Sequence, residues 1–383
     1  MRTQAFAQFP YQRPDYEIIA AAARQLLLFH DTEFDNDFFA ETSMSVTDYV
    51  KAFLACVLYA GHFGKESAGP WGVRLNSELD ITLIDTFFKN FALNFEDGRR
   101  YIEENTHQDS TVGFQFRELS PLWRKPFFQA SKTHYALYSR RLAIHSMDYL
   151  IYGLLKKSGG GGFSTAFGKI FESHIGEIIK NHFPNVTTEE ALRQRHGRKR
   201  KAVDWVIKEE NADIYIDAKS IELHSISQAM HEDQEFTKHL EHLSKAFIQI
   251  QSTAHCENSA KPFKYGLIIA YKEFYIHSIA DIWEFIGSKI EESLSEENIP
   301  IGIENNNVFV VSLCEFDLLM ALIEERGVSL GDVLAAYAKE RSLSLAAFLG
   351  NNYTIEKPVP SYLLNRYEAF IEEANPATIQ GVI

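Results

Sequence analysis

Two aspartates and a lysine stand in a segment whose polar and apolar residues alternate. Asp204 lies in the run 201–208, and Asp217 and Lys219 lie in the run 212–220. Both runs are rich in Val, Ile, Trp and Tyr, and a short polar loop separates them, so they predict two strands joined as a β-hairpin. Because successive side chains of a strand point to opposite faces, Asp217 and Lys219 share one face of this hairpin.

The length of the loop decides which charges meet across the hairpin. If residues 209–212 form the loop, the facing residues are Lys208 and Asp213, Val206 and Tyr215, and Asp204 and Asp217. Like charges facing each other in a sheet are unfavourable by roughly 0.2–1 kcal/mol, so the pattern predicts a bound cation between the two carboxylates. Taken singly, each acid could instead be a solvent-facing residue of a half-exposed hairpin. The opposite face is expected to enter a core and comprises Val203, Trp205, Ile207, Ile214, Ile216 and Ala218.

The size and composition of the chain predict two ordinary globular domains. It has 383 residues, of which 45% are hydrophobic. No apolar run approaches the ~18 residues of a membrane span, and the N-terminus lacks the profile of a signal peptide, so a cytoplasmic protein without membrane contact is expected. The cysteines are widely separated and are expected to be reduced core thiols, without disulfide or zinc pairing: Cys56, Cys256 and Cys314.

The charge of the chain is unevenly distributed. The net charge is −14, and residues 161–383 carry most of the excess acid. One short segment in this acidic half is strongly basic and contains Arg193, Arg195, Arg198, Lys199, Arg200 and Lys201. This basic cluster directly precedes the strand of Asp204. We expect it to contact nucleic-acid phosphates, whose neutralisation supplies affinity independent of sequence. The alternative is a solvated hairpin tip.

Apolar periodicity divides the chain into domains. Residues 1–157 are expected to form a mainly helical N-terminal domain, with an extended or hairpin-like crossing near the prolines of 119–128. The glycine-rich segment 158–162 favours neither helix nor strand and is expected to be a linker. Residues 163–383 then form a second domain with helical additions at its C-terminal end.

A glutamate lies within the helix expected over about 164–182. Glu172 has Gly168 and Gly176 one turn to either side of it. Each glycine costs a helix roughly 1 kcal/mol relative to alanine, so we expect another element, such as a sheet edge, to approach this stripe closely. A rotation of the helix would turn a different side chain toward the sheet, either His174 or Glu177.

The remaining patterns predict alternating strands and helices. After an extended segment at about 186–195 come the two hairpin strands. Further elements follow, with helices at 229–254 and 279–294, strands at 265–271 and 308–313, and C-terminal helices at 316–326, 330–340 and 361–373. The second domain is therefore expected to be an α/β fold with the order α-β-β-β-α-β and additions.

This combination of elements and residues resembles the PD-(D/E)xK nuclease superfamily, which has the restriction-endonuclease-like fold, a mixed sheet flanked by helices. The resemblance covers roughly residues 164–313 and depends on element order as much as on individual residues. The residues that support it are Glu172, Asp204, Asp217, Ala218, Lys219 and Gln249. The sequence departs from the family pattern in two places: no proline precedes Asp204, and the second acid is Asp217, where many members have glutamate.

The resemblance implies a metal site. Asp204 and Asp217 would bind a divalent ion, the backbone carbonyl of Ala218 would be a further ligand, and Glu172 would complete the metal shell or hold a metal-bound water. A few hard oxygen ligands, with positions left for water and phosphate, suit Mg²⁺ or Mn²⁺.

The resemblance also implies roles for two further side chains. Lys219 would orient the attacking water and stabilise the charge that builds on the phosphorus centre. A lysine beside two carboxylates should stay protonated, which favours this electrostatic role over that of a general base. Gln249 would assist at the margin of the site, although Gln251 is close by in the sequence.

The expected function is hydrolysis of phosphodiester bonds by a Mg²⁺- or Mn²⁺-dependent endonuclease, with DNA favoured as substrate and a restriction or anti-phage role by analogy. Fold membership does not fix the substrate. The alternatives are a nuclease that cleaves RNA and a catalytically inactive nuclease fold that binds nucleic acid or acts as a scaffold. A homodimer, or a protein partner bound through the N-terminal domain, is also open.

Overall fold

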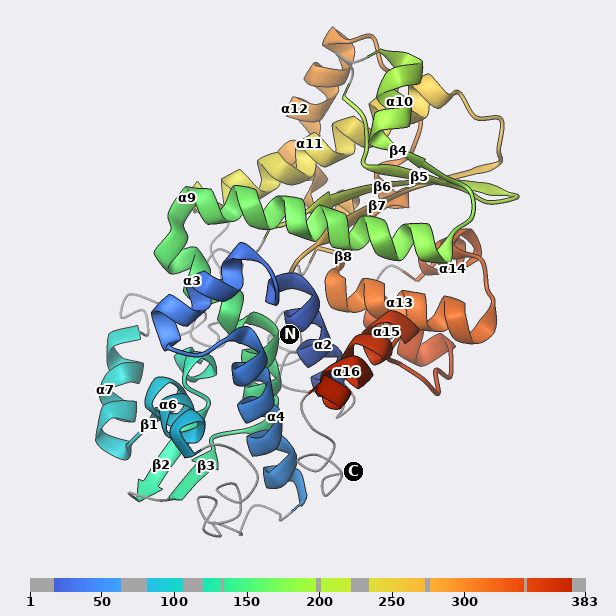
Figure 1. The fold of residues 1–383 in the computed structure, drawn as a ribbon. Helices are drawn as coiled ribbons and strands as arrows, with labels where there is room; N and C mark the ends of the chain where they lie inside the picture. The colour runs from blue at the N-terminus through green and yellow to red at the C-terminus, as the bar shows by residue number, and fades with distance from the viewer. Residues whose placement is uncertain are drawn as a thin grey trace. The chain divides into compact units, whose positions relative to one another are not determined.

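The chain is an α/β protein that divides into two compact units. The computed structural model describes residues 17–62, 81–105, 120–131, 134–197, 201–221, 234–272, 276–340 and 343–373. The first unit comprises residues 1–165 and 361–383, and the second comprises residues 166–360 (Figure 1). Within the described residues, no helix has the length and hydropathy needed to cross a membrane.

The first unit is mainly helical, as expected. Its helices are α2 Glu17–Phe29, α3 Glu33–Thr42, α4 Val46–His62, α6 Ile81–Phe91, α7 Phe95–Asn105, the first part of α9 and α16 Ser361–Glu373. A small sheet accompanies them, in which β1 Ala92–Leu93 pairs parallel with β2 Phe127–Ser131, and β2 pairs antiparallel with β3 His134–Leu137. The predicted crossing near the prolines is a 3₁₀ turn, Pro121–Arg124, followed by this hairpin.

Aromatic side chains fill the core of the first unit. Tyr49 packs edge-on against Phe91, and Phe53 packs in the same way against Phe87 and Phe127. Such tilted pairs add to the free energy gained from burial of the rings. The aromatic residues at helical spacing are therefore core residues.

The glycine-rich segment is not a linker outside regular structure. It lies within α9, Arg140–His182, in which Gly160 alone departs from helical geometry, with φ 54° and ψ −140°. A positive φ is easily adopted by glycine, so the helix is kinked here and continues. The boundary between the two units falls within the same helix, after Thr165.

The C-terminal helix belongs to the first unit, where α16 contacts α2. This grouping corrects the assignment of residues 361–383 to the second domain. The buried residues of α16 are Leu363, Tyr367 and Phe370, which recur at helical spacing. That spacing reveals an apolar face but does not identify the element that covers it.

The second unit is built on a five-stranded sheet with the order β4-β5-β6-β7-β8. The strands are β4 Val186–Thr188, β5 Trp205–Lys208, β6 Ala212–Lys219, β7 Phe263–Ala270 and β8 Val308–Ser312. Neighbours are antiparallel from β4 to β6 and parallel from β6 to β8. Parallel neighbours need crossover connections, which contain α11 Gln234–Glu257 and α12 Trp283–Glu296.

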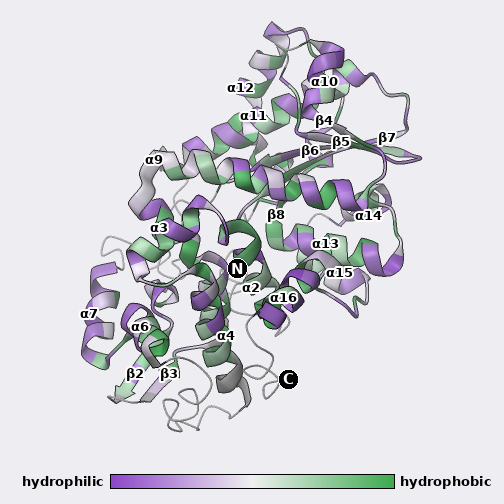
Figure 2. Ribbon diagram, viewed as in Figure 1, coloured by the Kyte–Doolittle hydropathy of each residue, from purple (hydrophilic) through white to green (hydrophobic). Residues whose placement is uncertain are grey.

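Helices cover both faces of this sheet. On one face, Val206, Tyr215 and Ile268 join a hydrophobic cluster with residues of α11 and α12. Each of these two helices bears hydrophobic and hydrophilic residues (Figure 2), and the hydrophobic ones point into the cluster. The other face meets α9, where a Cβ added to Gly176 would lie 3.0 Å from the ring of Trp205.

From the second part of α9 to β7, the second unit follows the expected order α-β-β-β-α-β except that helix α10 is inserted between the first two strands, and α12 and β8 come after it. Only the first residues of the predicted extended segment 186–195 form a strand, because helix α10, Glu189–His196, begins directly after it. Helices α13 Leu313–Arg326 and α14 Leu330–Tyr337 match the expected C-terminal helices, whereas α15 Leu345–Asn352 was not expected.

Candidate metal centre

The register of β5 and β6 is the predicted one. The paired residues are Trp205 with Ile216, Val206 with Tyr215, Ile207 with Ile214, and Lys208 with Asp213. Asp204 lies one residue before β5, so continuing the register by one residue places Asp204 opposite Asp217. By strand alternation, both aspartates lie on the face of Tyr215, which is covered by α11.

The hairpin is buried on both faces, which corrects the half-exposed alternative. Asp217 is 0% exposed, Asp213 is 1% exposed and Tyr215 is 0% exposed. β6 is the central strand of the sheet, and helices cover each side of it. Charged residues in such a place require partners. Asp213 has one in Lys261, whose Nζ lies 3.0 Å from its carboxylate.

Asp204 is held in place by the backbone of the neighbouring strand. Its side chain is 9% exposed, and its Oδ2 accepts a hydrogen bond of 2.7 Å from the backbone N–H of Ala218. Burial, and then the charge of Asp217, raise the pKa of Asp204 to about 8, although Lys219 and this hydrogen bond act in the opposite direction. Near neutral pH, the carboxyl group of Asp204 therefore holds a proton that a cation could displace.

The buried Asp217 forms an ion pair with the half-buried Lys219, with 2.5 Å between Oδ2 and Nζ. Burial raises the pKa of Asp217, and Lys219 opposes that rise. Burial alone would lower the pKa of Lys219, but the charges of Asp217 and Asp204 outweigh it, and the pKa is raised. Lys219 is therefore an ammonium ion at neutral pH, as its expected electrostatic role requires.

Gln249, and not Gln251, is the glutamine at this site. The Nζ of Lys219 donates to Oε1 of Gln249 over 3.4 Å, and Nε2 of Gln249 donates to the carbonyl of Ala202 over 2.9 Å. Gln251 is buried elsewhere and bonds the backbone of Gly302 and Ile303. The amide of Gln249 therefore links Lys219 to the segment that leads into Asp204.

Thr253, which the sequence did not single out, anchors the same segment. Its hydroxyl accepts a hydrogen bond of 3.0 Å from the backbone N–H of Val203 and donates one of 2.8 Å to the carbonyl of Gln249. Thr253 lies one helical turn after Gln249, so one stripe of α11 holds both Lys219 and the residue before Asp204. The spacing of four residues from Gln249 could have pointed to Thr253 in the sequence, but threonines at such positions are common in helices of every kind.

Glu172 lies near the site but forms no hydrogen bond or ion pair with any residue that the structure describes. Its side chain is exposed, on a helix whose neighbouring His174 is buried. Burial and the charge of Glu189 raise the pKa of Glu172, and its own charge raises the pKa of both Asp204 and Asp217. This electrostatic coupling places Glu172 at the margin of the site, where it could hold a metal-bound water.

The residues at this site fit a divalent cation held by two carboxylates. The Oδ1 atom of Asp217 is buried and accepts no hydrogen bond from any described residue, which costs free energy unless a cation or a donor reaches it. Among the described residues, no group of three or more His, Cys, Asp or Glu side chains is placed to hold an ion. Two carboxylates with positions left for water and phosphate match the way Mg²⁺ is often bound.

The described part of the basic cluster is already paired with carboxylates. Arg193 lies 2.5 Å from Glu189, and Lys201 lies 2.7 Å from Glu297. Arg195 and His196 both lie 2.6 Å from the buried side chain of Glu257. A phosphate would have to compete with these acids. Three further residues of the cluster, Arg198, Lys199 and Arg200, lie outside the described residues.

Cys56 is buried, as expected of a core thiol, whereas Cys256 and Cys314 are only half-buried, and no disulfide joins any two of the three. No family model, no curated protein and no solved structure matches this chain.

Proposed function

We propose that this chain is a metal-dependent nuclease that hydrolyses phosphodiester bonds, with DNA as the favoured substrate. The observation that supports this most is the meeting of two buried carboxylates, Asp204 and Asp217, beside the ammonium group of Lys219. Buried acids with raised pKa values and a specific counter-charge are typical of functional sites.

The residues have distinct roles in this proposal. Asp204 and Asp217 hold a Mg²⁺ or Mn²⁺ ion, which lowers the pKa of bound water and polarises the phosphoryl oxygen when present. Lys219 stabilises the negative charge that develops on the phosphate group during hydrolysis, and Gln249 holds the ammonium group in position. Glu172 adds negative charge at the margin of the site and can orient water.

A binding or scaffold protein without catalytic activity is the second candidate. The observation that favours it is the ion pair of Lys219, which already compensates the charge of Asp217 without a metal ion. In that case the buried charges would stabilise a fold that binds nucleic acid and cleaves nothing. RNA as the substrate is a variant of the first proposal.

A cleavage assay separates these candidates. Supercoiled plasmid and single-stranded RNA are incubated with Mg²⁺ and with wild type, Asp217→Asn or Lys219→Gln. Glu210→Gln, an exposed change in the loop of the same hairpin, is the matched control. The proposal expects cleavage by wild type and by the control, and loss of cleavage in both site variants. Cleavage that survives both site variants refutes the site, and absence of any cleavage favours the scaffold.

The restriction or anti-phage role, the homodimer and the protein partner of the first unit stay predictions. The substrate arm of the cleavage assay is the first step in narrowing the biological role, since it distinguishes DNA from RNA.

A further inference from the structure

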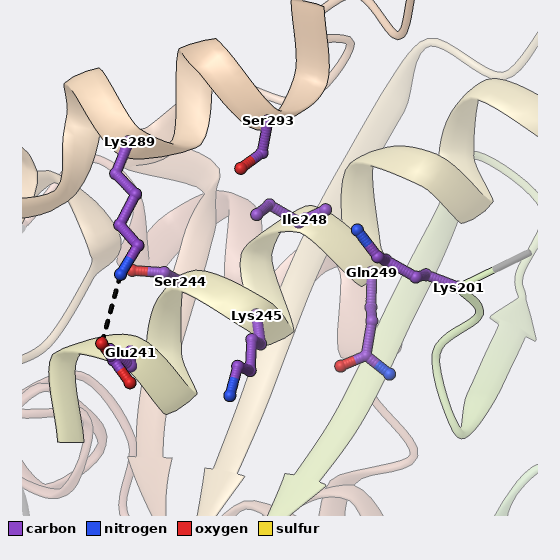
Figure 3. Close-up of a pocket in the computed structure, with 8 residues that line it drawn as sticks. All are labelled: Lys201, Glu241, Ser244, Lys245, Ile248, Gln249, Lys289 and Ser293. Carbon is purple, nitrogen blue, oxygen red and sulfur yellow. Dashed lines mark hydrogen bonds and ion pairs between the residues drawn. The ribbon is translucent and has the colours of Figure 1, made fainter. Parts of the chain in front are cut away.

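A groove runs between α11 and α12 in the second unit. It has a volume of about 440 Å³ and is lined by Lys201, Glu241, Ser244, Lys245, Ile248, Gln249, Lys289 and Ser293 (Figure 3). The α11 residues recur at intervals of three and four, so they form one stripe of that helix. α12 supplies the opposite wall, and Lys201 lies at the end near Gln249.

The groove is basic in an otherwise acidic protein. Three lysines line it against a single acid, Glu241. Lys289 lies 3.2 Å from Glu241, and Lys201 pairs with Glu297 outside the lining. Lys245 is exposed and forms no recorded ion pair with any described residue. Glu241 is the nearest acid to Lys245, one helical turn away on α11, and its charge is shared with Lys289. The three lysines therefore leave the groove with a net positive charge for an anionic ligand.

The groove adjoins the candidate metal centre at Gln249. This side chain lines the groove and also accepts a hydrogen bond from Lys219, the partner of Asp217. A phosphate held beside Lys219, the more exposed member of that ion pair, would therefore lie next to the groove. The stripe from Gln249 back to Glu241 spans about 12 Å, at about 1.5 Å per residue. That length suits a short stretch of one strand.

We propose that this groove binds one strand of the nucleic-acid substrate, next to the phosphodiester bond that is cut, with phosphates on Lys245 and Lys289 and a sugar or base on Ile248. The choice of ligand depends on the proposed nuclease function. Packed helices lie only about 8–10 Å apart, so a groove between two of them accommodates one backbone and not a duplex. A positively charged groove that follows the backbone is a common feature of single-strand sites.

The test is a binding experiment that needs no cleavage. Fluorescence anisotropy follows a labelled six-nucleotide single-stranded DNA, its RNA counterpart and the DNA duplex, without divalent metal and at several salt concentrations. The variants are Lys245→Gln/Lys289→Gln, which removes the two positive charges, and Glu241→Gln, which removes the acid. Lys339→Gln, an exposed lysine that does not line the groove, is the matched control for loss of charge.

The proposal expects the double lysine variant to bind the single strand about tenfold more weakly, with a slope of log K against log[salt] that is shallower by about 1.4, since each phosphate contact contributes about 0.7. Glu241→Gln should bind more tightly, and Lys339→Gln should bind as wild type does. Unchanged affinity in the double variant overturns the proposal, and so does a duplex that is bound more tightly through the same lysines.

Failure of the groove proposal and failure of the nuclease proposal give different results. Loss of binding in the double variant, together with absence of cleavage by wild type, supports the groove and refutes the nuclease. Cleavage that depends on Asp217, together with binding unaffected in the double variant, supports the nuclease and refutes the groove.

Discussion

The backbone N–H of Ala218 donates a hydrogen bond of 2.7 Å to Oδ2 of Asp204. This bond fixes a buried carboxylate that lies outside the strand ladder, and it holds Asp204 beside the strand that carries Asp217. In an extended strand, the N–H and C=O of one residue point to the same edge, so the carbonyl of Ala218 also faces the side of Asp204. This orientation is compatible with the expected role of the Ala218 carbonyl as a further ligand of the metal ion.

Asp204→Asn should change how stability depends on pH. The pKa of Asp204 is raised from 3.8 to about 8 in the folded chain, so its stabilising contribution is complete below the lower value and is lost as pH rises through the higher one. Asparagine keeps the acceptor for Ala218 and does not titrate. The advantage of the variant should therefore grow between about pH 4 and pH 8, by at most about 1.4 kcal/mol per pH unit.

Urea denaturation of wild type and Asp204→Asn across this range measures the effect. Addition of Mg²⁺ should reduce the difference in stability between the two proteins near pH 8, because an ion bound to the carboxylates stabilises wild type. Parallel stability curves for the two proteins would show that Asp204 does not titrate as the structure requires.

Lys219→Gln should lower kcat much more than it raises KM. Glutamine retains a hydrogen-bond donor near Asp217 but loses the charge that stabilises the developing negative phosphate. Removal of one such electrostatic contact typically costs about 10²–10³-fold in kcat. Steady-state kinetics on a labelled oligonucleotide give both constants. Equal kcat values for wild type and variant would mean that Lys219 serves only to balance the buried charge of Asp217.

Thr253→Val should weaken both the fold and the site. Valine has a similar shape but cannot accept the hydrogen bond from Val203, so the N–H of this buried residue loses its partner, at a cost of about 1–3 kcal/mol. Thr253→Ser, which keeps the hydroxyl group, is the matched control. Denaturation and cleavage assays on both variants check this, and an unaltered Thr253→Val protein would exclude the anchoring role.

The two glycines beside Glu172 should respond differently to alanine. A Cβ at Gly176 would lie 3.0 Å from the ring of Trp205, whereas a Cβ at Gly168 would lie 3.2 Å from the hydroxyl of Ser220. The buried indole cannot easily move, so Gly176→Ala should destabilise the fold by about 1–3 kcal/mol. The serine hydroxyl can rotate, so Gly168→Ala should be neutral or stabilising by up to about 1 kcal/mol.

Thermal or urea denaturation compares these two glycine variants directly. If they prove equally stable, the close approach of α9 to β5 is not what requires glycine at position 176.

The hairpin register and the residues brought to the site could be predicted from local patterns. Alternation sets the face of Asp217 and Lys219, and the loop length sets the pairing across β5 and β6. The burial of both faces could not be predicted, because the acids of β6 are typical of a half-exposed strand. Their burial depends on the distant residues that cover and neutralise them, such as Lys261 and the apolar face of α11.

The unit boundaries could not be predicted from composition. Glycines usually interrupt helices, but here Phe163 packs against Tyr152 and Phe34 in the first unit, and this packing continues α9 beyond the kink at Gly160. Tertiary contacts override the local preference. The same reason explains α16, because sequence proximity does not indicate which element covers an apolar face.

The central claim is that Asp204 and Asp217 together bind a divalent cation. Isothermal titration with Mn²⁺ at pH 8 tests it most directly, on wild type, Asp217→Asn and the exposed control Glu210→Gln. The account predicts one ion bound by wild type and by the control, with binding lost in Asp217→Asn. Binding to Asp217→Asn with wild-type affinity, or absence of binding to wild type with and without a substrate oligonucleotide, would contradict it.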